Sequence, residues 1–194
     1  MSTLKVRVHD DVPVLQKYKV LVLGGPNVGK TSIFQRLMGN EFESTRPHIG
    51  VNIGLKSLEL EGGPTIVIEL WDVPSLPTLA KGDQTKYFED CHAVIFVSSK
   101  TDATSLAHAQ AYHAALATKY PGDNDLRLGV PAVHFKTKCD CPTEELPTEE
   151  TLSWLKCTKM DSFDVSAKVN RGLQVALKLL LVLVLPPNAA FDES

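Results

Sequence analysis

The stretch YKVLVLGGPNVGKT, Tyr18 to Thr31, decides the fold of this 194-residue chain. Its first half is a short apolar run that ends in glycine, which predicts a buried strand. Its second half matches G-x-x-x-x-G-K-[ST], and KTSIFQRLMG, Lys30 to Gly39, continues with apolar residues at helical spacing. A glycine-rich turn between a strand and a helix offers backbone N–H groups and a helix N-terminus to an anion. The stretch therefore predicts a phosphate-binding loop.

Side chains of this loop add to what its backbone offers. Lys30 is expected to reach the β- and γ-phosphates of a nucleotide. The Thr31 hydroxyl is expected to ligate Mg²⁺, which prefers oxygen. The residues predicted to contact the phosphates are Gly25, Asn27, Val28, Gly29, Lys30, Thr31 and Ser32.

Strand and helix patterns alternate outward from the loop. Strands are predicted within 92–99, 130–138 and 162–168, and two more form a hairpin within 53–72 around a turn at 61–64. Helices are predicted within 104–122, 148–157 and 171–185. This alternation predicts an α/β fold with a mostly parallel sheet, one antiparallel hairpin and helices on both faces. We expect one domain at 17–187, between tails at 1–16 and 188–194.

The composition excludes several classes of protein. Apolar residues make up 43% and charged residues 22%, and the net charge is −3, so nothing predicts a nucleic-acid partner. The four cysteines are scattered, no apolar leader precedes them, and no second pair completes a zinc site with Cys139 and Cys141. We expect reduced thiols in a cytoplasmic protein. The longest apolar run, at 179–185, is too short to span a membrane.

Two later stretches of the sequence indicate which base the bound nucleotide carries. TKCD, Thr137 to Asp140, resembles the N/T-K-x-D motif of the small GTPases, and SAK, Ser166 to Lys168, resembles their last motif. With KYKVLVLG, VGKTS, IGVNIGLKSLEL, ELWD and FDVSAK in order, residues 17–185 resemble the Ras superfamily and its Rab branch most. The resemblance implies the small-GTPase fold, about six strands, and GTP or GDP with Mg²⁺ as cofactors. A P-loop kinase or ATPase would lack the two base motifs.

The resemblance also implies roles in holding guanine. Asp140 would be a buried carboxylate that accepts hydrogen bonds from guanine N1 and N2, a pattern that adenine does not offer. Lys138 would lay its stem along the base, and N–H groups near Ala167 would meet guanine O6. Phe42 stands where the family places an aromatic ring against the base. Thr137, where many members have Asn, has a smaller side chain to brace the phosphate loop.

Other positions depart from the family pattern. In ELWDVPSLP, Glu69 to Pro77, the family's W-D-x-A-G-Q becomes W-D-V-P-S-L. Asp72 is kept as a second Mg²⁺ ligand beside Thr31. Ser75 replaces the glycine that approaches the γ-phosphate, and Leu76 replaces the glutamine. Leucine has neither donor nor acceptor and cannot orient a water, so no catalytic residue is assigned.

The first switch and the phosphate loop are altered as well. His48 stands where the family has a threonine that ligates Mg²⁺, and imidazole is a poor ligand for that ion. His48 either faces solvent or hydrogen-bonds a phosphate oxygen, and Thr45 is an alternative hydroxyl nearby. Pro26 lacks an N–H and crowds the entry of an arginine finger.

These changes predict an atypical Rab-like GTPase that binds guanine nucleotide and hydrolyses GTP slowly or not at all. By analogy with the family, it would act in vesicle or intraflagellar transport, in the cytoplasm and at the periphery of vesicles or the flagellum. The alternative is a scaffold or subunit of a transport complex in which the nucleotide is structural or absent.

Partners are expected to be effector or transport-complex proteins that bind the switch surface or the apolar final helix. That helix is apolar almost all round, so it is either deeply packed or presents an interface through Leu181 and Leu185. No cysteine follows Cys157, so a prenylated tail is either missing from the sequence given or the chain reaches membranes only through partners.

Overall fold

A computed structural model of the chain describes residues 16–43, 50–59, 65–75, 84–123, 127–143 and 145–185. These residues form a six-stranded sheet with the order β2-β3-β1-β4-β5-β6. Only β2 and β3 pair antiparallel, and the other neighbours are parallel. The strands are β1 (Gln16–Gly24), β2 (Asn52–Glu59), β3 (Thr65–Asp72), β4 (Ala93–Ser99), β5 (Ala132–Thr137) and β6 (Asp161–Asp164).

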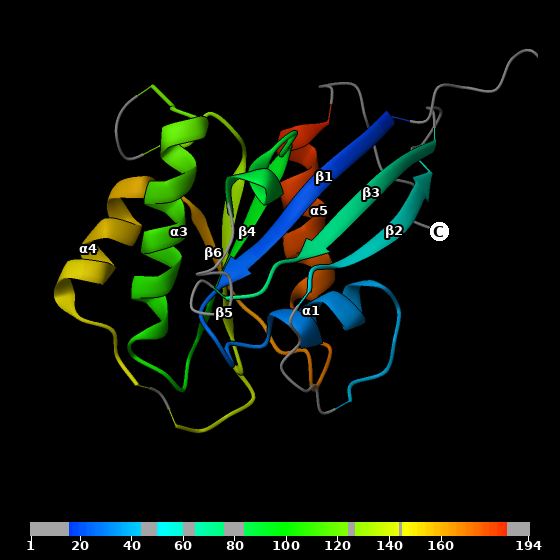
Figure 1. Cartoon of the computed structure of the whole chain (residues 1–194). Coiled ribbons are helices and arrows are strands. Elements are labelled where there is room, and N and C mark those ends of the chain that lie inside the picture. The colour runs from blue at the N-terminus through cyan, green and yellow to red at the C-terminus, as the bar shows by residue number, and fades with distance from the viewer. Residues whose placement is uncertain are drawn as a thin grey trace, which may run out of the picture.

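The helices cover both faces of the sheet, and α3 and α4 lie on the opposite side from α1 and α5 (Figure 1). Their bounds are α1 (Lys30–Leu37), the 3₁₀ helix η1 (Gln84–Phe88), α3 (Ser105–Lys119), α4 (Glu149–Thr158) and α5 (Leu173–Val184). This architecture confirms the predicted fold class. The sequence patterns did not predict η1. The turn at 61–64 lies outside the described residues, and the domain limits at 16 and 187 stay predictions.

Two apolar cores result from the alternation of side chains along the strands. On β1, Val20 and Val22 face α1 and α5, whereas Leu21 and Leu23 face α3 and α4, and all four are fully buried. Strands buried on both sides carry continuous apolar runs, which is why YKVLVLG could be recognised.

The parallel strands bring the predicted site residues to one edge. β1 ends at Gly24, β3 at Asp72, β4 at Ser99 and β5 at Thr137, and these strands run in the same direction. Ligands of open α/β sheets bind outside the carboxyl ends of the strands. The fold therefore gathers the phosphate loop, Asp72 and the TKCD stretch at the expected place.

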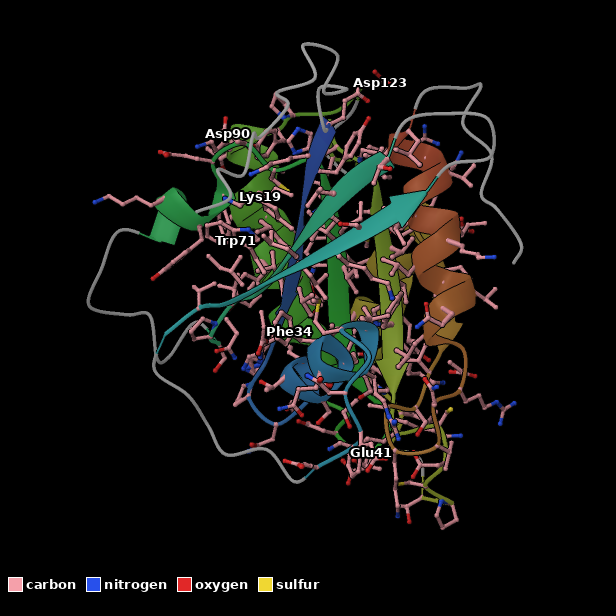
Figure 2. The ribbon with its side chains drawn as sticks, turned by 90° about the vertical axis from the view of Figure 1, so that its right-hand side faces the viewer. Lys19, Phe34, Glu41, Trp71, Asp90 and Asp123 are labelled. Atoms are coloured by element: carbon pink, nitrogen blue, oxygen red, sulfur yellow. The ribbon has the colours of Figure 1, made fainter. Side chains whose placement is uncertain are left out.

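A separate cluster lies on the face that α3 and α4 cover. The Lys19 ammonium lies 3.8 Å from the centroid of the Trp71 ring and donates to the Glu89 carbonyl at 2.7 Å (Figure 2). Burial lowers the pKa of Lys19, against the nearby carboxylates that raise it. This contact fixes η1 and the segment after it to the strands.

Candidate functional site

The phosphate loop joins β1 to α1 through two left-handed residues. Asn27 has φ 57° and Gly29, which precedes the first residue of α1, has φ 96°. Gly24 packs against β4, since a Cβ there would lie 2.3 Å from the Val97 carbonyl oxygen. The loop therefore needs glycine at two points for different reasons, one a close approach and the other a backbone conformation.

Lys30 lies beneath this loop with only 7% of its surface exposed. Its ammonium donates to the carbonyls of Gly24 at 3.0 Å and Gly25 at 2.7 Å. Burial lowers the pKa of Lys30 to about 8, and the Asp72 carboxylate only partly offsets this. A phosphate beside this buried cation would favour its charged form.

Thr31 and Asp72 meet where a metal ion is expected. The Thr31 hydroxyl donates to Asp72 Oδ2 at 2.7 Å, and the Asn52 amide donates to the same oxygen at 3.2 Å. A hydroxyl and a fully buried carboxylate are the oxygen ligands that Mg²⁺ prefers, so this pair fits the ion together with phosphate oxygens. Within the described ranges, no group of three or more His, Cys, Asp or Glu residues is placed to hold a metal.

Thr137 braces the phosphate loop despite its small side chain. Its hydroxyl donates to the Val28 carbonyl at 2.6 Å and lies 3.0 Å from the Ser98 carbonyl oxygen. The side chain is buried, and Gly29 lies just above it. The expected weakness of threonine at this position is therefore not seen.

The TKCD and SAK stretches are hydrogen-bonded to each other. The Ser166 hydroxyl donates to Asp140 Oδ1 at 2.6 Å and accepts from the Val169 N–H at 3.2 Å. Lys138 is in the left-handed conformation with φ 59°, and its ammonium lies 3.4 Å from the Thr101 hydroxyl. The Asp140 carboxylate is oriented by Ser166 and is exposed in this structure, and its burial beneath a bound guanine stays a prediction.

Arg36 of α1 holds the SAK stretch from the other side. Its Nε donates to the Ala167 carbonyl at 2.7 Å, and Nη2 donates to the Lys168 carbonyl at 3.2 Å. Neither Arg36 nor Asn52 could be predicted from the sequence, because both act through contacts between segments far apart in the chain.

A cavity of about 350 Å³ connects these parts at the carboxyl edge. It brings together ten of the predicted residues: Asn27, Gly29, Ser32, Phe42, Thr137, Lys138, Asp140, Ser166, Ala167 and Lys168. Its wall also includes Ile33, Glu43 and Cys141, which were not predicted. Gly25, Val28, Lys30 and Thr31 lie in the adjoining phosphate loop rather than on this wall. An acceptor carboxylate, an aromatic ring and a lysine stem suit a purine base with donors on one edge.

The described part of the second switch, which is the ELWDVPSLP stretch at 69–77, is held in place. The Tyr112 hydroxyl of α3 donates to the Pro74 carbonyl at 3.0 Å, and Ser75 is 8% exposed. Val73, fully buried, donates its N–H to the Val22 carbonyl at 3.4 Å. Thr45, His48 and Leu76 lie outside the described residues, so their predicted roles stay predictions.

The prediction for the outer face of the final helix was wrong in its residues. Leu181 and Leu185 are 1% and 6% exposed and pack in the core with α1 and the sheet. The exposed apolar side chains of α5 are Val175, Leu179, Val182 and Leu183. Among the described residues, no helix combines the length and apolar character that crossing a membrane requires. All four cysteines are free thiols.

Comparison with known proteins places this architecture in a family. The sequence profile of the Ras family matches residues 19–185, and the chain belongs to that family of small GTPases.

The curated relatives that the chain matches include several Rab proteins. Mouse Ras-related protein Rab-33A is 29% identical over 161 residues, which cover 82% of this chain and 65% of that protein. Rab-32C of Dictyostelium discoideum is 29% identical over 180 residues, or 91% of this chain and 77% of the relative. Human Rab-32 is 26% identical over 183 residues, or 91% and 78%. The chain thus spans slightly less than two thirds of the mouse relative's length.

Proposed function

We propose that this Rab-like chain binds GTP or GDP with Mg²⁺ and hydrolyses GTP slowly or not at all. The observation that carries the proposal is a pair of 2.6 Å hydrogen bonds, one from Thr137 of the TKCD stretch to the Val28 carbonyl of the phosphate loop and one from Ser166 to Asp140. A base reader and a phosphate cradle are thereby fixed relative to each other. Leu76 stands where the family's water-orienting glutamine belongs.

Each kept residue has a task in nucleotide binding. The Lys30 ammonium neutralises phosphate charge, and the amides at the start of α1 donate to phosphate oxygens. Thr31 and Asp72 would hold Mg²⁺, which supplies further neutralisation of the phosphates when bound. Arg36 keeps the Ala167 carbonyl in place, so the following N–H groups are oriented toward the base.

The contacts of the second switch are a further reason to expect slow turnover of GTP. A conventional switch loop changes its order with the γ-phosphate. Here the Pro74 carbonyl is tied to Tyr112 of α3, and proline restricts the backbone just before Ser75. Restoring the family pattern at Pro74, Ser75 and Leu76 should therefore restore hydrolysis.

The test is single-turnover hydrolysis of GTP by protein loaded in the presence of Mg²⁺. We expect wild-type protein to retain GTP for hours and a Pro74→Ala, Ser75→Gly, Leu76→Gln variant to hydrolyse it at least about tenfold faster. Leu183→Gln is the matched control, because Leu183 is exposed on α5 and lies outside the nucleotide cavity. Rapid hydrolysis by the wild type would refute slow turnover, and equal rates in all three proteins would refute its attribution to Pro74, Ser75 and Leu76.

We further propose that the loaded form acts through effector proteins in vesicle or intraflagellar transport, in the cytoplasm and at the periphery of vesicles or the flagellum. A scaffold in which the nucleotide is structural or absent is the second candidate. The hydrogen bond from Thr31 to Asp72 Oδ2 favours it, because this bond joins the two side chains through the protein alone. Addition of EDTA, which removes Mg²⁺, distinguishes the slow GTPase from the scaffold. If the protein then loses its nucleotide but keeps its fold and its partner binding, the scaffold is favoured.

A further inference from the structure

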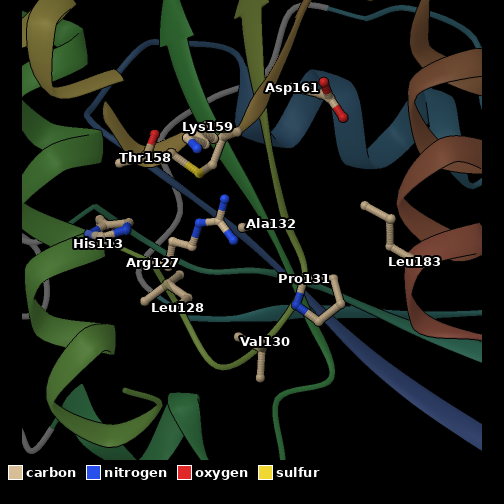
Figure 3. Close-up of a pocket in the computed structure, with 11 residues that line it drawn as sticks. His113, Arg127, Leu128, Val130, Pro131, Ala132, Thr158, Lys159, Asp161 and Leu183 are labelled. Carbon is tan, nitrogen blue, oxygen red and sulfur yellow. The ribbon is translucent and has the colours of Figure 1, made fainter. Parts of the chain in front are cut away.

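We propose that a second cavity, at the amino ends of β5 and β6, binds a small organic monocarboxylate with a compact apolar body. This β5–β6 cavity has a volume of about 310 Å³ (Figure 3). Ala132 at its wall begins β5 and Asp161 begins β6, whereas Thr137 of the nucleotide site ends β5. The two cavities therefore lie at opposite edges of the sheet, and the inference does not depend on nucleotide binding.

The wall of the β5–β6 cavity is apolar on several sides. Leu128 and Pro131 come from the connection before β5, Met160 from the connection before β6, and Leu183 from α5. Leu183 is 54% exposed, so this apolar surface is open to solvent and not part of the sealed core. Small-molecule sites combine such an apolar lining with a few polar groups that set orientation.

Two cationic side chains enter this cavity from different elements. Figure 3 shows Arg127 directed toward the end of the cavity where Lys159 lies, with Asp161 farther along the wall. Within the part of the chain that the structure describes, none of the three forms an ion pair. Two cations against one carboxylate leave a net charge of +1, which suits a monoanion.

The backbone at both cations has defined contacts, whereas their side chains, like that of Asp161, are exposed to solvent at the mouth of the cavity. Lys159 ends α4 in the left-handed conformation with φ 54°, a position where glycine is preferred. The Arg127 carbonyl accepts from the Gly122 N–H at 3.2 Å, and Pro121 bridges to Leu128. Each cation is therefore attached to a fixed point of the chain, and lysine is used where glycine would fit with less strain.

The geometry selects a carboxylate as the charged part of the ligand. A guanidinium presents two parallel N–H groups that match a carboxylate, and a lysine ammonium adds a third donor. The Asp161 carboxylate disfavours a dianion at the same place. Among the ligands that such a cavity can hold, an aryl- or branched alkyl-carboxylate satisfies both the charge and the apolar wall.

The experiment titrates the ¹⁵N-labelled full chain, as purified, by NMR with 3-phenylpropionate. Its neutral isostere 3-phenylpropionamide, inorganic phosphate, and the blocked peptide acetyl-Gly-Glu-Gly-amide form the comparison arms. We expect saturable shifts around Ala132 and Asp161 with phenylpropionate, and at least fivefold weaker binding of the other three. Equal binding of the amide would overturn the role of charge, and stronger binding of phosphate or of the peptide would overturn the choice of a small carboxylate.

Variants of the wall complete the test. Lys159→Gly and Arg127→Gln should each weaken phenylpropionate at least threefold, and Asp161→Asn should strengthen it. Lys159→Gly relieves a left-handed lysine, so it should fold at least as stably as the wild type, and lost binding cannot then be attributed to unfolding. Lys156→Gln, on α4 but outside the cavity, removes the same charge and should leave binding unchanged. Unchanged binding by Lys159→Gly, or equal weakening by Lys156→Gln, would refute the site.

Discussion

His134 should make the stability of this protein depend on pH in a specific range. Its imidazole is 2% exposed on β5, with Nε2 2.8 Å from Ser98 Oγ and Nδ1 2.7 Å from Ser162 Oγ. Burial, together with the positive charge of Lys136, lowers the pKa of His134 to about 4, and the Asp164 carboxylate opposes the change. The ring is therefore neutral in the folded protein at pH 7.

The sign and size of this pH dependence follow from the linkage between proton binding and folding. The ordinary pKa of 6.5 lies above the folded value of about 4, so the unfolded chain binds more protons between these values. Stability contributed by the neutral ring is present above pH 6.5 and is lost as the pH falls toward 4. At ~1.4 kcal/mol per pKa unit, the full loss is about 3 kcal/mol, of which about 2 kcal/mol occurs between pH 7 and pH 5.

Urea unfolding of the wild type and of His134→Gln at pH 7, 6 and 5 measures this effect. Carboxylates titrate in both proteins, so the difference between the two pH profiles isolates His134. We expect the wild type to lose about 2 kcal/mol more than the variant from pH 7 to pH 5. The variant should itself be less stable at pH 7 by ~1–3 kcal/mol, because one of the two serines loses its partner. Parallel profiles would refute the reasoning, as would an NMR titration of His134 with its midpoint near 6.5.

Three substitutions test the site and the fold. Asp140→Asn replaces one acceptor oxygen with a donor, so GTP binding should weaken at least about a hundredfold, while XTP, whose base offers an acceptor at that edge, should bind better. Competition with fluorescent GDP measures both affinities. An unchanged preference for GTP over XTP would contradict the assignment of guanine as the base. Arg36→Ala removes the donors to the Ala167 carbonyl, so GDP release should accelerate several-fold without loss of the fold, in stopped-flow measurements. Gly24→Ala places a Cβ 2.3 Å from the Val97 carbonyl oxygen and should lower the free energy of unfolding in urea by ~2–4 kcal/mol. Gly39→Ala is the control: no atom lies within 4 Å of its added Cβ, and only the φ of 87° should cost ~1 kcal/mol.

Local sequence patterns were enough to predict the strands, the helices and the phosphate loop. Buried parallel strands carry apolar runs that need no knowledge of their neighbours, and the G-x-x-x-x-G-K-T match fixes a turn and a helix start together. Thr137 and Ser166 were predicted through family motifs, and the structure places them near each other because β6 pairs parallel with β5 and ends at the same edge of the sheet.

Features that depend on pairing between distant segments were beyond the sequence. Asn52 reaches Asp72 only through the register of β2 on β3, and Arg36 reaches Ala167 across 131 positions. The exposure of Asp140 and the burial of Leu181 depend on which side of a loop or helix faces the rest of the fold. An apolar helix such as α5 has no polar stripe from which its buried face could be predicted.

The most direct test of the central claim is the nucleotide content of the purified protein. The chain would be denatured, the released nucleotide identified and counted by chromatography, and the fate of added GTP followed for hours in the presence of Mg²⁺. The account predicts close to one guanine nucleotide per chain and added GTP that persists. Protein that releases none and binds neither GTP nor GDP would contradict it.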